Sequence, residues 1–321
     1  MLQEMLRITD DYAKEPELNR LMKQFIREKA ADHSIWSEMT IASCLMFGGD
    51  ESEALSRAAA LTELIILTLD IVDDLQDRDK DDKSWMQCPE AFTLNAVLAC
   101  MAAGIGELAQ LQRHSRSDAS LGIQVSGMLA RSISGQQQDI GGRLEMEEDY
   151  IRMVQEKSGS LIRLACFMGS SLAEDGGPGT ESGFDELADC IGIIAQIEND
   201  LNDLIRFDLK NDLVQKKRTL PILYMLMHCD EEFPVLRQYY EDALSRDYFL
   251  RHKAACLDFI DSCGCVEYTR VIQSLYLDRA ESLWNGLPAV SPWKEAWKEL
   301  TLGPFAGRLA MENQQASARI P

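Results

Sequence analysis

The stretch ELIILTLDIVDDLQDRDKDD, which spans residues 63–82, joins an apolar helical run to a cluster of carboxylates. Asp70, Asp73 and Asp77 recur at spacings of three and four residues, so on a helix they lie along one face, and Asp74 borders the same stripe. Like charges at this spacing repel one another unless water or a cation lies between them. Mg²⁺ prefers oxygen ligands, usually one or two carboxylates completed by water and substrate phosphates. The stretch therefore indicates either a solvated acidic helix end or part of a metal site.

A second stretch repeats this pattern further along the chain. Residues 193–203, IIAQIENDLND, again run from an apolar helical approach into oxygen-bearing side chains, at Asn199, Asp200 and Asp203. Asn199 and Asp203 are four residues apart and so face the same way, with Gln196 one turn earlier. Two apolar helices that each end in carboxylates are typical of a helical bundle whose ligands converge on its interior. The pair favours a site for a polyphosphate held through metal ions.

A polyphosphate site also needs positive side chains, and a few lysines are candidates. Lys157 stands in an otherwise apolar helical stretch, whereas Lys210, Lys216 and Lys217 come shortly before the sequence TLP at residues 219–221. Taken alone, each lysine is typical of a solvated surface. Lys157 is the least surface-like of the four.

Composition narrows the class of protein. Of the 321 residues, 46% are hydrophobic, which is ample for a sizeable core. Asp and Glu outnumber Lys and Arg by 53 to 32, and the net charge of −21 argues against nucleic acid or an anionic membrane surface as a general partner. Nine scattered cysteines and four histidines, none at metal-ligand spacing, favour a reduced, cytoplasmic protein without a zinc site. No stretch approaches the roughly 20 uninterrupted apolar residues of a membrane span, so we do not expect an integral membrane protein.

The remaining sequence predicts helices separated by short breaks. Apolar residues recur at helical spacing, and no run alternates in the manner of a strand. Residues 80–90 and 174–182 are predicted as loops, residues 147–172 as one helix, and Ser182 with Asp185 as a capping box that opens the next helix. The prediction is an all-α fold of roughly ten or more helices, in a single domain over residues 1–321 with a less regular tail after about residue 287.

Five motifs, in this order, resemble those of the trans-isoprenyl diphosphate synthase superfamily, whose members are class I all-α enzymes with a central cavity. The resemblance covers nearly the whole chain. Its parts are DDLQD at residues 73–77 as a first DDxxD, GQQQD at 135–139 as GQxxD, KS at 157–158 as a Lys-Thr step, QIENDLND at 196–203 as the second aspartate-rich motif, and DLVQKKRTLP at 212–221 as the closing DLxxxKxTLP signature.

Three departures from that superfamily affect the acceptor side. Chain-elongating members carry Gly-Lys-Arg-x-Arg-Pro before the first motif, where this chain has HSIWS at residues 33–37. They carry a histidine in the helix leading to the motif, where Ile66 stands here, and two arginines after it, where RDKDDK stands at residues 78–83. These groups bind the second diphosphate, that of isopentenyl diphosphate. The resemblance therefore implies that the donor half of the site is kept and the acceptor half is changed.

This combination is similar to the ComQ family. The similarity is carried by LDIVDDLQD at residues 69–77, DKSWM at 82–86 and KNDLVQKKRTLPILY at 210–224. Members of that family prenylate a tryptophan in the precursor of a secreted quorum-sensing peptide, ComX, of Gram-positive bacteria. The resemblance implies transfer of a geranyl or farnesyl group from its diphosphate to a peptide tryptophan, as part of pheromone maturation for competence. It also implies attack by indole C3, followed by ring closure through a backbone nitrogen.

The resemblance also implies roles for individual residues. Mg²⁺ ions would be held by Asp73, Asp77, Asn199 and Asp203, with Asp74 and Asp200 as further ligands or as residues that support the ligands. Two lysines, Lys157 and Lys217, would pair with the leaving diphosphate, and Gln136 and Gln196 would provide polar lining. Thr68 and Leu69 lie where the family sets prenyl chain length, and because neither is a bulky aromatic residue a C15 chain is accommodated. The superfamily commonly forms dimers, which makes a homodimer an expectation.

Other readings stay open at this point. A terpene cyclase would use the same donor site, but its usual second motif has Ser or Thr where Asp203 stands and Glu where Phe207 stands. A short-chain prenyl diphosphate synthase is disfavoured by the three departures. A regulatory partner subunit is disfavoured because it has no need to keep both carboxylate clusters.

Overall fold

The computed structural model describes residues 1–32, 34–78, 81–116, 120–174, 178–206 and 211–305. Within these residues the regular structure consists of helices, without a strand, and this confirms the all-α prediction. The α-helices are α1 (Leu2–Tyr12), α2 (Pro16–Ala31), α3 (Trp36–Leu45), α4 (Glu53–Asp77), α5 (Ser84–Gln87), α6 (Glu90–Leu111), α7 (Leu121–Gly141), α8 (Glu147–Val154), α9 (Ser160–Ser170), α10 (Pro178–Arg206), α11 (Asp212–Gln215), α12 (Leu220–Glu232), α13 (Pro234–Tyr240), α14 (Arg246–Arg251), α15 (Lys253–Ser262), α16 (Cys265–Gly286) and α17 (Trp293–Thr301). One π-helical turn, η1 (Gln155–Gly159), joins α8 to α9.

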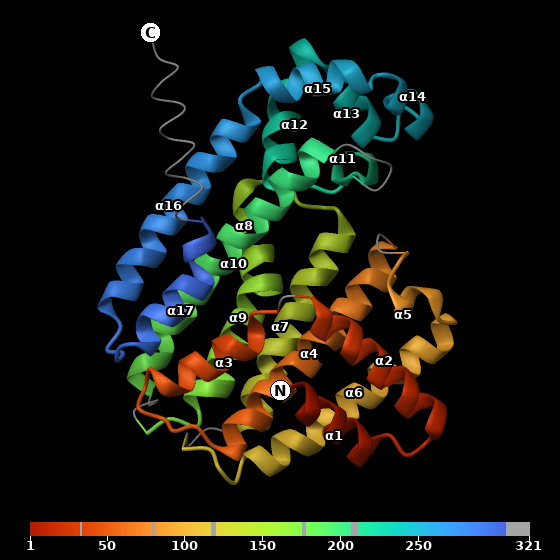
Figure 1. Cartoon of the computed structure of the whole chain (residues 1–321). Coiled ribbons are helices and arrows are strands. Elements are labelled where there is room, and N and C mark those ends of the chain that lie inside the picture. Colours follow the sequence, from red (N-terminus) through yellow and green to blue (C-terminus); the bar gives the residue numbers. More distant parts are fainter. Residues whose placement is uncertain (33, 79–80, 117–119, 175–177, 207–210, 306–321) are drawn as a thin grey trace. The chain divides into compact units, whose positions relative to one another are not determined.

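The chain forms two compact units, and Figure 1 shows its course through both. The first comprises Met1–Leu129, Leu161–Asp185 and Gly286–Pro304, and the second comprises Ala130–Ser160, Glu186–Asn285 and Phe305–Pro321. The single domain expected from the sequence stays a prediction.

Helix α4 is the core of the first unit, with α3 and α6 packed against it (Figure 1). Ser52 begins the helix, because its Oγ accepts a hydrogen bond from the Leu55 amide at 3.1 Å. Residues 58–68 are buried on every side, as their nearly unbroken apolar sequence predicts. Glu63 is the one charged residue in this buried run. Its carboxylate accepts hydrogen bonds from the amide of Ser37 at 2.8 Å and the hydroxyl of Ser34 at 2.7 Å.

Helix α6 is long and apolar enough to cross a membrane by length and composition, alone among the helices in the described ranges. One such helix is a weak indication, since a core helix passes the same test. One face of α6 does pack into the core, through residues such as Ala96, Cys100 and Ala103. Its other face exposes Leu98 and Ile105, 66% and 71% accessible respectively.

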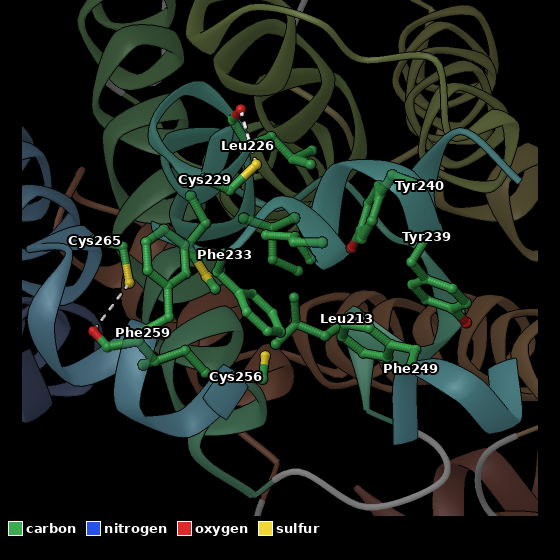
Figure 2. Close-up of a cluster of buried hydrophobic side chains, with 14 of the residues drawn as sticks. Leu213, Leu226, Cys229, Phe233, Tyr239, Tyr240, Phe249, Cys256, Phe259 and Cys265 are labelled. Atoms are coloured by element: carbon green, nitrogen blue, oxygen red, sulfur yellow. Dashed lines mark hydrogen bonds between the residues drawn. The ribbon is translucent and has the colours of Figure 1, made fainter. Parts of the chain in front are cut away.

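The second unit has a core of aromatic, aliphatic and cysteine side chains (Figure 2). The Tyr239 ring stacks on Phe249 with ring centroids 4.3 Å apart. Tyr239 donates its hydroxyl to the Val214 carbonyl at 2.6 Å, and Tyr240 donates to the Lys217 carbonyl at 2.9 Å. These two hydrogen bonds attach the segment that contains α11 and Lys217 to this core.

The structure differs from the predicted elements in four places. The expected loop over residues 80–90 contains α5, and the expected helix over residues 147–172 is divided into α8, η1 and α9. The predicted capping box of Ser182 and Asp185 is wrong, because α10 already begins at Pro178, a residue whose fixed φ suits the first helical position. The tail after residue 287 contains α17, whose Trp297 is fully buried and donates Nε1 to the Ser43 hydroxyl at 3.1 Å.

Candidate active site

The first aspartate-rich motif occupies the last turn of α4. Asp74 is 1% exposed, and its Oδ2 accepts a hydrogen bond from the indole Nε1 of Trp85 at 2.8 Å. Trp85 is itself 2% exposed, on α5. Asp73 and Asp77 are partly exposed. The motif therefore has two partly exposed carboxylates, of which Asp73 has its Oδ1 buried, and one carboxylate, Asp74, that is held inside the unit.

The fourth carboxylate of the acidic stripe has a different role. Asp70 lies 2.5 Å from the ammonium of Lys29 on α2, in a partly exposed ion pair. This pair neutralises one of four neighbouring negative charges and so reduces the repulsion along α4. Arg78 follows the last helical residue, Asp77, and its left-handed φ of 55° ends the helix just after the motif.

The two residues predicted to set chain length lie one turn before the motif. Thr68 is buried, and its hydroxyl donates to the Leu64 carbonyl at 2.7 Å. Leu69 is partly buried and packs against an apolar cluster that includes Ile65 and Leu129. Both are therefore placed against apolar surroundings within the first unit, and their effect on product length stays a prediction.

In the second unit, glycines bring three helical segments into backbone contact. A Cβ on Gly135 of α7 would lie 2.3 Å from the backbone nitrogen of Lys157, and one on Gly192 of α10 would lie 2.7 Å from the backbone nitrogen of Gly159. Only a residue without a side chain permits such an approach. As a result, the Lys157 ammonium lies 2.7 Å from Oδ2 of Asp139 on α7.

A second set of contacts joins η1 to the second aspartate-rich motif. Ser158 donates its hydroxyl to Oε1 of Gln196 at 3.3 Å, and Gln196 donates Nε2 to Oδ1 of Asp200 at 2.8 Å. The hydroxyl of Tyr150, which is completely buried, donates to the other oxygen of Asp200 at 2.6 Å. The contacts thus connect three of the predicted positions, Gln196, Asp200 and the Lys157-Ser158 pair, in one polar network.

Burial governs the acidity of this network. Asp200 is 3% exposed, and burial raises its pKa to about 6, although the hydrogen bonds from Tyr150 and Gln196 act in the opposite direction. Burial, together with the adjacent Asp200 carboxylate, raises the pKa of Tyr150 well above its usual value. The Tyr150 hydroxyl is therefore a permanent donor to Asp200 at neutral pH.

The C-terminal end of the motif forms a second group of contacts. Asp203 accepts the amide of Asp212 at 2.7 Å through Oδ2 and the guanidinium of Arg206 at 2.9 Å through Oδ1. The ammonium of Lys217 lies 3.6 Å from Oδ1 of Asp212. Burial raises the pKa of Asp212 to about 7, while Lys217 opposes the rise. Asp212 thus contacts both Asp203, through its backbone amide, and Lys217, through its carboxylate.

The other predicted residues are placed as follows. Asn199 is exposed on α10, although the next residue, Asp200, is buried. Gln136 is partly buried on α7. Lys216 forms an ion pair with Asp242. Lys210 lies outside the described residues.

Three contact residues were missed by sequence reasoning. Trp85 and Tyr150 each donate a hydrogen bond to the buried carboxylate of one motif, and Asp139 pairs with Lys157. Asp139 could have been found, because it ends the GQQQD motif. A tryptophan inside the polar stretch at residues 80–90 was the available signal for Trp85.

The oxygen donors suit a hard divalent cation. No group of three Asp, Glu, His or Cys side chains that could hold a metal is found among the described residues. A cation such as Mg²⁺ does not require one, since it commonly takes one or two carboxylates and completes its shell with water and phosphate oxygens. Asp73 and Asp77 on α4, and Asn199 and Asp203 on α10, offer oxygen ligands of this kind.

Comparison with known proteins identifies the family. A model of the polyprenyl synthetase family matches residues 16–252. The tryptophan prenyltransferase ComQ of Bacillus subtilis (strain 168) is 27% identical over 298 residues, which cover 91% of this chain and 94% of that protein. This agrees with the resemblance that the motifs predict.

Solved structures support the fold. A geranylgeranyl pyrophosphate synthase from Corynebacterium glutamicum, complexed with calcium and isoprenyl diphosphate, has a TM-score of 0.72 at 21% identity, covering 94% of this chain and 92% of that one. Another, from Lactobacillus brevis, has a TM-score of 0.75 at 17% identity, with coverages of 93% and 94%. Since the family model spans most of the sequence, the chain belongs to the polyprenyl synthetase family and is a prenyltransferase.

Proposed function

We propose that this prenyltransferase uses Mg²⁺ to transfer a geranyl or farnesyl group from its diphosphate to a tryptophan in the precursor of a quorum-sensing pheromone, which matures the peptide for competence signalling. The observation that carries the proposal is that the chain keeps the donor side, with both aspartate-rich motifs and Lys157, but not the acceptor side. At the positions where chain-elongating enzymes bind a second diphosphate, this chain has HSIWS, Ile66 and RDKDDK instead. The similarity to ComQ over most of both chains supports it.

The chain's own residues suit the first half of this reaction. Asp73, Asp77, Asn199 and Asp203 would hold the metal, and the buried Asp74 and Asp200 would support them or complete the ligand set. Bound Mg²⁺ would supply positive charge to the departing diphosphate. Lys157 and Lys217 would add to that charge through their ammonium groups, with Gln136 and Gln196 as polar lining.

The second half of the reaction takes place in apolar surroundings. The bond between the allylic carbon and the diphosphate oxygen breaks, and its electron pair leaves with the diphosphate. Indole C3 donates an electron pair to the allylic carbon, and a backbone nitrogen of the peptide closes on C2. That nitrogen's proton passes to a base, for which the released pyrophosphate is a candidate. The apolar faces of α4 and α6 would exclude water from the cation, and Thr68 and Leu69 would limit the chain length.

We also infer that the enzyme is a cytoplasmic homodimer. Leu94, Leu98 and Ile105 are exposed along one face of α6, and together with the exposed Ile123 at the start of α7 they are here called the α6 stripe. Exposed apolar surface that is grouped on one helix face is typical of an interface between subunits. Reduced thiols and a net charge of −21 suit the cytoplasm.

The alternative activity is that of a class I terpene cyclase or a short-chain prenyl diphosphate synthase. The synthase is favoured by one observation, the similarity in fold to geranylgeranyl pyrophosphate synthases. At 17–21% identity that similarity concerns the fold, which the proposed activity shares.

The test is incubation of the protein with Mg²⁺ and geranyl or farnesyl diphosphate, with and without tryptophan peptides, followed by mass spectrometry. The peptides are the product of any small reading frame beside the gene and a library of tryptophan-centred sequences. A peptide that gains one prenyl unit supports the proposal, provided that Asp73→Ala loses the activity about 10²-fold or more and Asp82→Ala, exposed in the same stretch, keeps it. A hydrocarbon product, or a longer diphosphate formed when isopentenyl diphosphate is added, would show the alternative activity instead.

A further inference from the structure

The first unit has an open groove of about 700 Å³ between α3 and α17. Its walls are mostly apolar, with Ile41 and Ala42 on the α3 side and Trp293 and Leu300 on the α17 side. This volume is within the range of grooves that take a small ligand or several side chains of a peptide. Figure 1 shows the two helices side by side.

Contacts outside the groove lining hold α17 against α3. Trp297 of α17 is fully buried and bonded to Ser43 of α3, and its ring packs edge-on against Phe184 with centroids 5.7 Å apart. The amide of Val290 donates to the carbonyl of Met46 at 2.9 Å. These contacts fix α17 beside α3, and the groove lies between the two helices.

Charge indicates what kind of ligand the groove would take. Glu38 of α3 and Glu299 of α17 are both exposed and both border it. The whole chain carries a net charge of −21. An apolar segment with a basic side chain is complementary to such a groove, whereas an acidic or anionic ligand is repelled.

One end of the groove, at Ile35, is connected to α4, because Ile35 lies two residues before Ser37 of α3. Glu63 of α4 fixes the start of α3, because it accepts the amide of Ser37 at 2.8 Å. Asp73 follows Glu63 by ten residues, which corresponds to about 15 Å along an α-helix. An extended peptide covers that distance in about five residues.

We propose that this groove binds the acceptor peptide, holding an apolar and basic segment at least about five residues from the tryptophan that is prenylated. The inference rests on the proposed function and adds to it a binding site for the part of the peptide that does not react.

The first test reverses the charge of the groove. The double variant Glu38→Lys/Glu299→Lys is compared with Glu51→Lys, an exposed glutamate of the same unit that does not border the groove. The substrate is the tryptophan peptide that the wild-type protein modifies best. We expect the KM for peptide to rise about tenfold or more in the double variant and to stay unchanged in the control. Binding of an unreactive farnesyl thiodiphosphate with Mg²⁺, and the thermal unfolding midpoint, should be the same in all three proteins.

The second test identifies the occupant directly. Ala296 of the groove wall is replaced by a photoreactive benzoylphenylalanine, and the full-length protein is irradiated with Mg²⁺, farnesyl thiodiphosphate and the same peptide. Crosslinks to the peptide, competed by excess unlabelled peptide, are the expected result. Crosslinks only to a second copy of the chain, or only to residues 306–321, would overturn the inference.

The two proposals can fail separately. If the wild-type protein prenylates a peptide and the double variant has an unchanged peptide KM, the groove assignment is wrong and the proposed function stands. If the wild-type protein modifies no peptide, the proposed function fails, and the groove assignment fails with it.

Discussion

Two motif carboxylates, Asp74 and Asp200, are buried and bonded to aromatic donors. Trp85 lies 11 residues after Asp74, and Tyr150 lies 50 residues before Asp200. An indole N–H or a phenol O–H holds a carboxylate oxygen in one direction and so helps to fix the orientation of the helix end that carries the motif. We therefore regard Trp85 and Tyr150 as positioning residues, which act on a metal or a diphosphate through the carboxylates that they orient.

Replacing Trp85 by Phe tests this role. The variant keeps most of the apolar packing and removes one hydrogen-bond donor from a buried carboxylate, which should lower the free energy of unfolding by about 1–3 kcal/mol. The Mg²⁺ concentration that gives half-maximal activity should rise several-fold. Urea unfolding and a magnesium titration measure the two effects. Trp36→Phe, at a partly buried tryptophan on α3, is the control. Equal loss of activity at all Mg²⁺ concentrations would count against a positioning role.

The raised pKa of Asp200 predicts a pH dependence of stability. The pKa of Asp200 is about 6 in the folded protein and 3.8 in the reference state, so the folded protein binds more protons than the unfolded chain between these pH values. The stabilisation that comes from this proton binding is complete below about pH 4 and is lost as the pH rises through about 6. The loss amounts to about 3 kcal/mol at most. Asp200→Asn removes the titration while keeping an oxygen acceptor for Tyr150.

We expect Asp200→Asn to gain stability relative to wild type as the pH rises from 4.5 to 7.5, in chelator to exclude metal. Urea unfolding at both pH values measures the difference. Asp247→Asn, at an exposed aspartate on α14, is the control and should follow the wild-type curve. Parallel curves for Asp200→Asn and wild type would contradict the prediction. The pKa of Asp212 is raised to about 7, in part by the Asp200 carboxylate, so Asp200→Asn also lowers the pKa of Asp212 and this adds to the expected gain at the higher pH.

At the scale of helices, the position of Lys157 depends on how closely α7 approaches η1. Gly135→Ala should separate the two segments, because the new Cβ would be 2.3 Å from the Lys157 nitrogen. Overpacking of this kind costs about 1–3 kcal/mol of stability, and the displacement of Lys157 from Asp139 should lower kcat about tenfold or more.

A matched control lies on the same helix. Gly127 of α7 has open space around the position of a Cβ, so Gly127→Ala should stabilise the protein by about 0.5–1 kcal/mol and leave activity unchanged. Thermal unfolding and steady-state kinetics on both variants separate a helix-propensity effect from a packing effect. The prediction is wrong if both alanine variants behave alike.

The elements that the sequence predicts well are those with a local cause. Helix α4 follows from the capping Ser52 and an apolar run, and its carboxylate stripe follows from spacing alone. The four residues of α5 have no such cause, since the burial of Trp85 against distant residues orders them. The same holds for α17, which forms where Trp297 meets α3. The division of residues 147–172 at η1 arises where glycines of α7 and α10 touch the backbone, a contact that no local pattern reveals.

The candidate site likewise combines features that the local sequence predicts with features that depend on contacts between distant residues. Spacing predicted the carboxylates, and the order of motifs predicted the family, which the comparisons confirm. Spacing could not show that Asp74 and Asp200 are buried while their neighbours, the partly exposed Asp73 and the exposed Asn199, are not. Adjacent residues at one helix end differ in burial only through the side chains that pack on them. The donors Trp85 and Tyr150 are contributed by other helices and were not predicted.

At the scale of the whole molecule, removal of metal should act on ligand binding more than on folding. With chelator present, farnesyl diphosphate should not raise the thermal unfolding midpoint, because the carboxylates repel an unscreened diphosphate. With Mg²⁺ the same ligand should raise it by several degrees, as linkage requires for a ligand that binds only the folded state. Differential scanning fluorimetry measures both shifts. In Asp73→Ala/Asp77→Ala the shift should be absent with or without Mg²⁺, and a full shift there would contradict the predicted metal ligands.

The α6 stripe predicts the state of association. Its residues are 44–72% exposed, and burying them in a second copy removes apolar area from water, at about 25 cal/mol per Å². We expect a dimer in analytical ultracentrifugation at micromolar concentration, and a monomer for Leu98→Glu/Ile105→Glu, because a buried unpaired carboxylate is costly. The control Met227→Glu replaces a residue that is 64% exposed on α12, outside the stripe, and should stay dimeric. A wild-type monomer, or a double variant that still associates, would show that α6 has another partner or none.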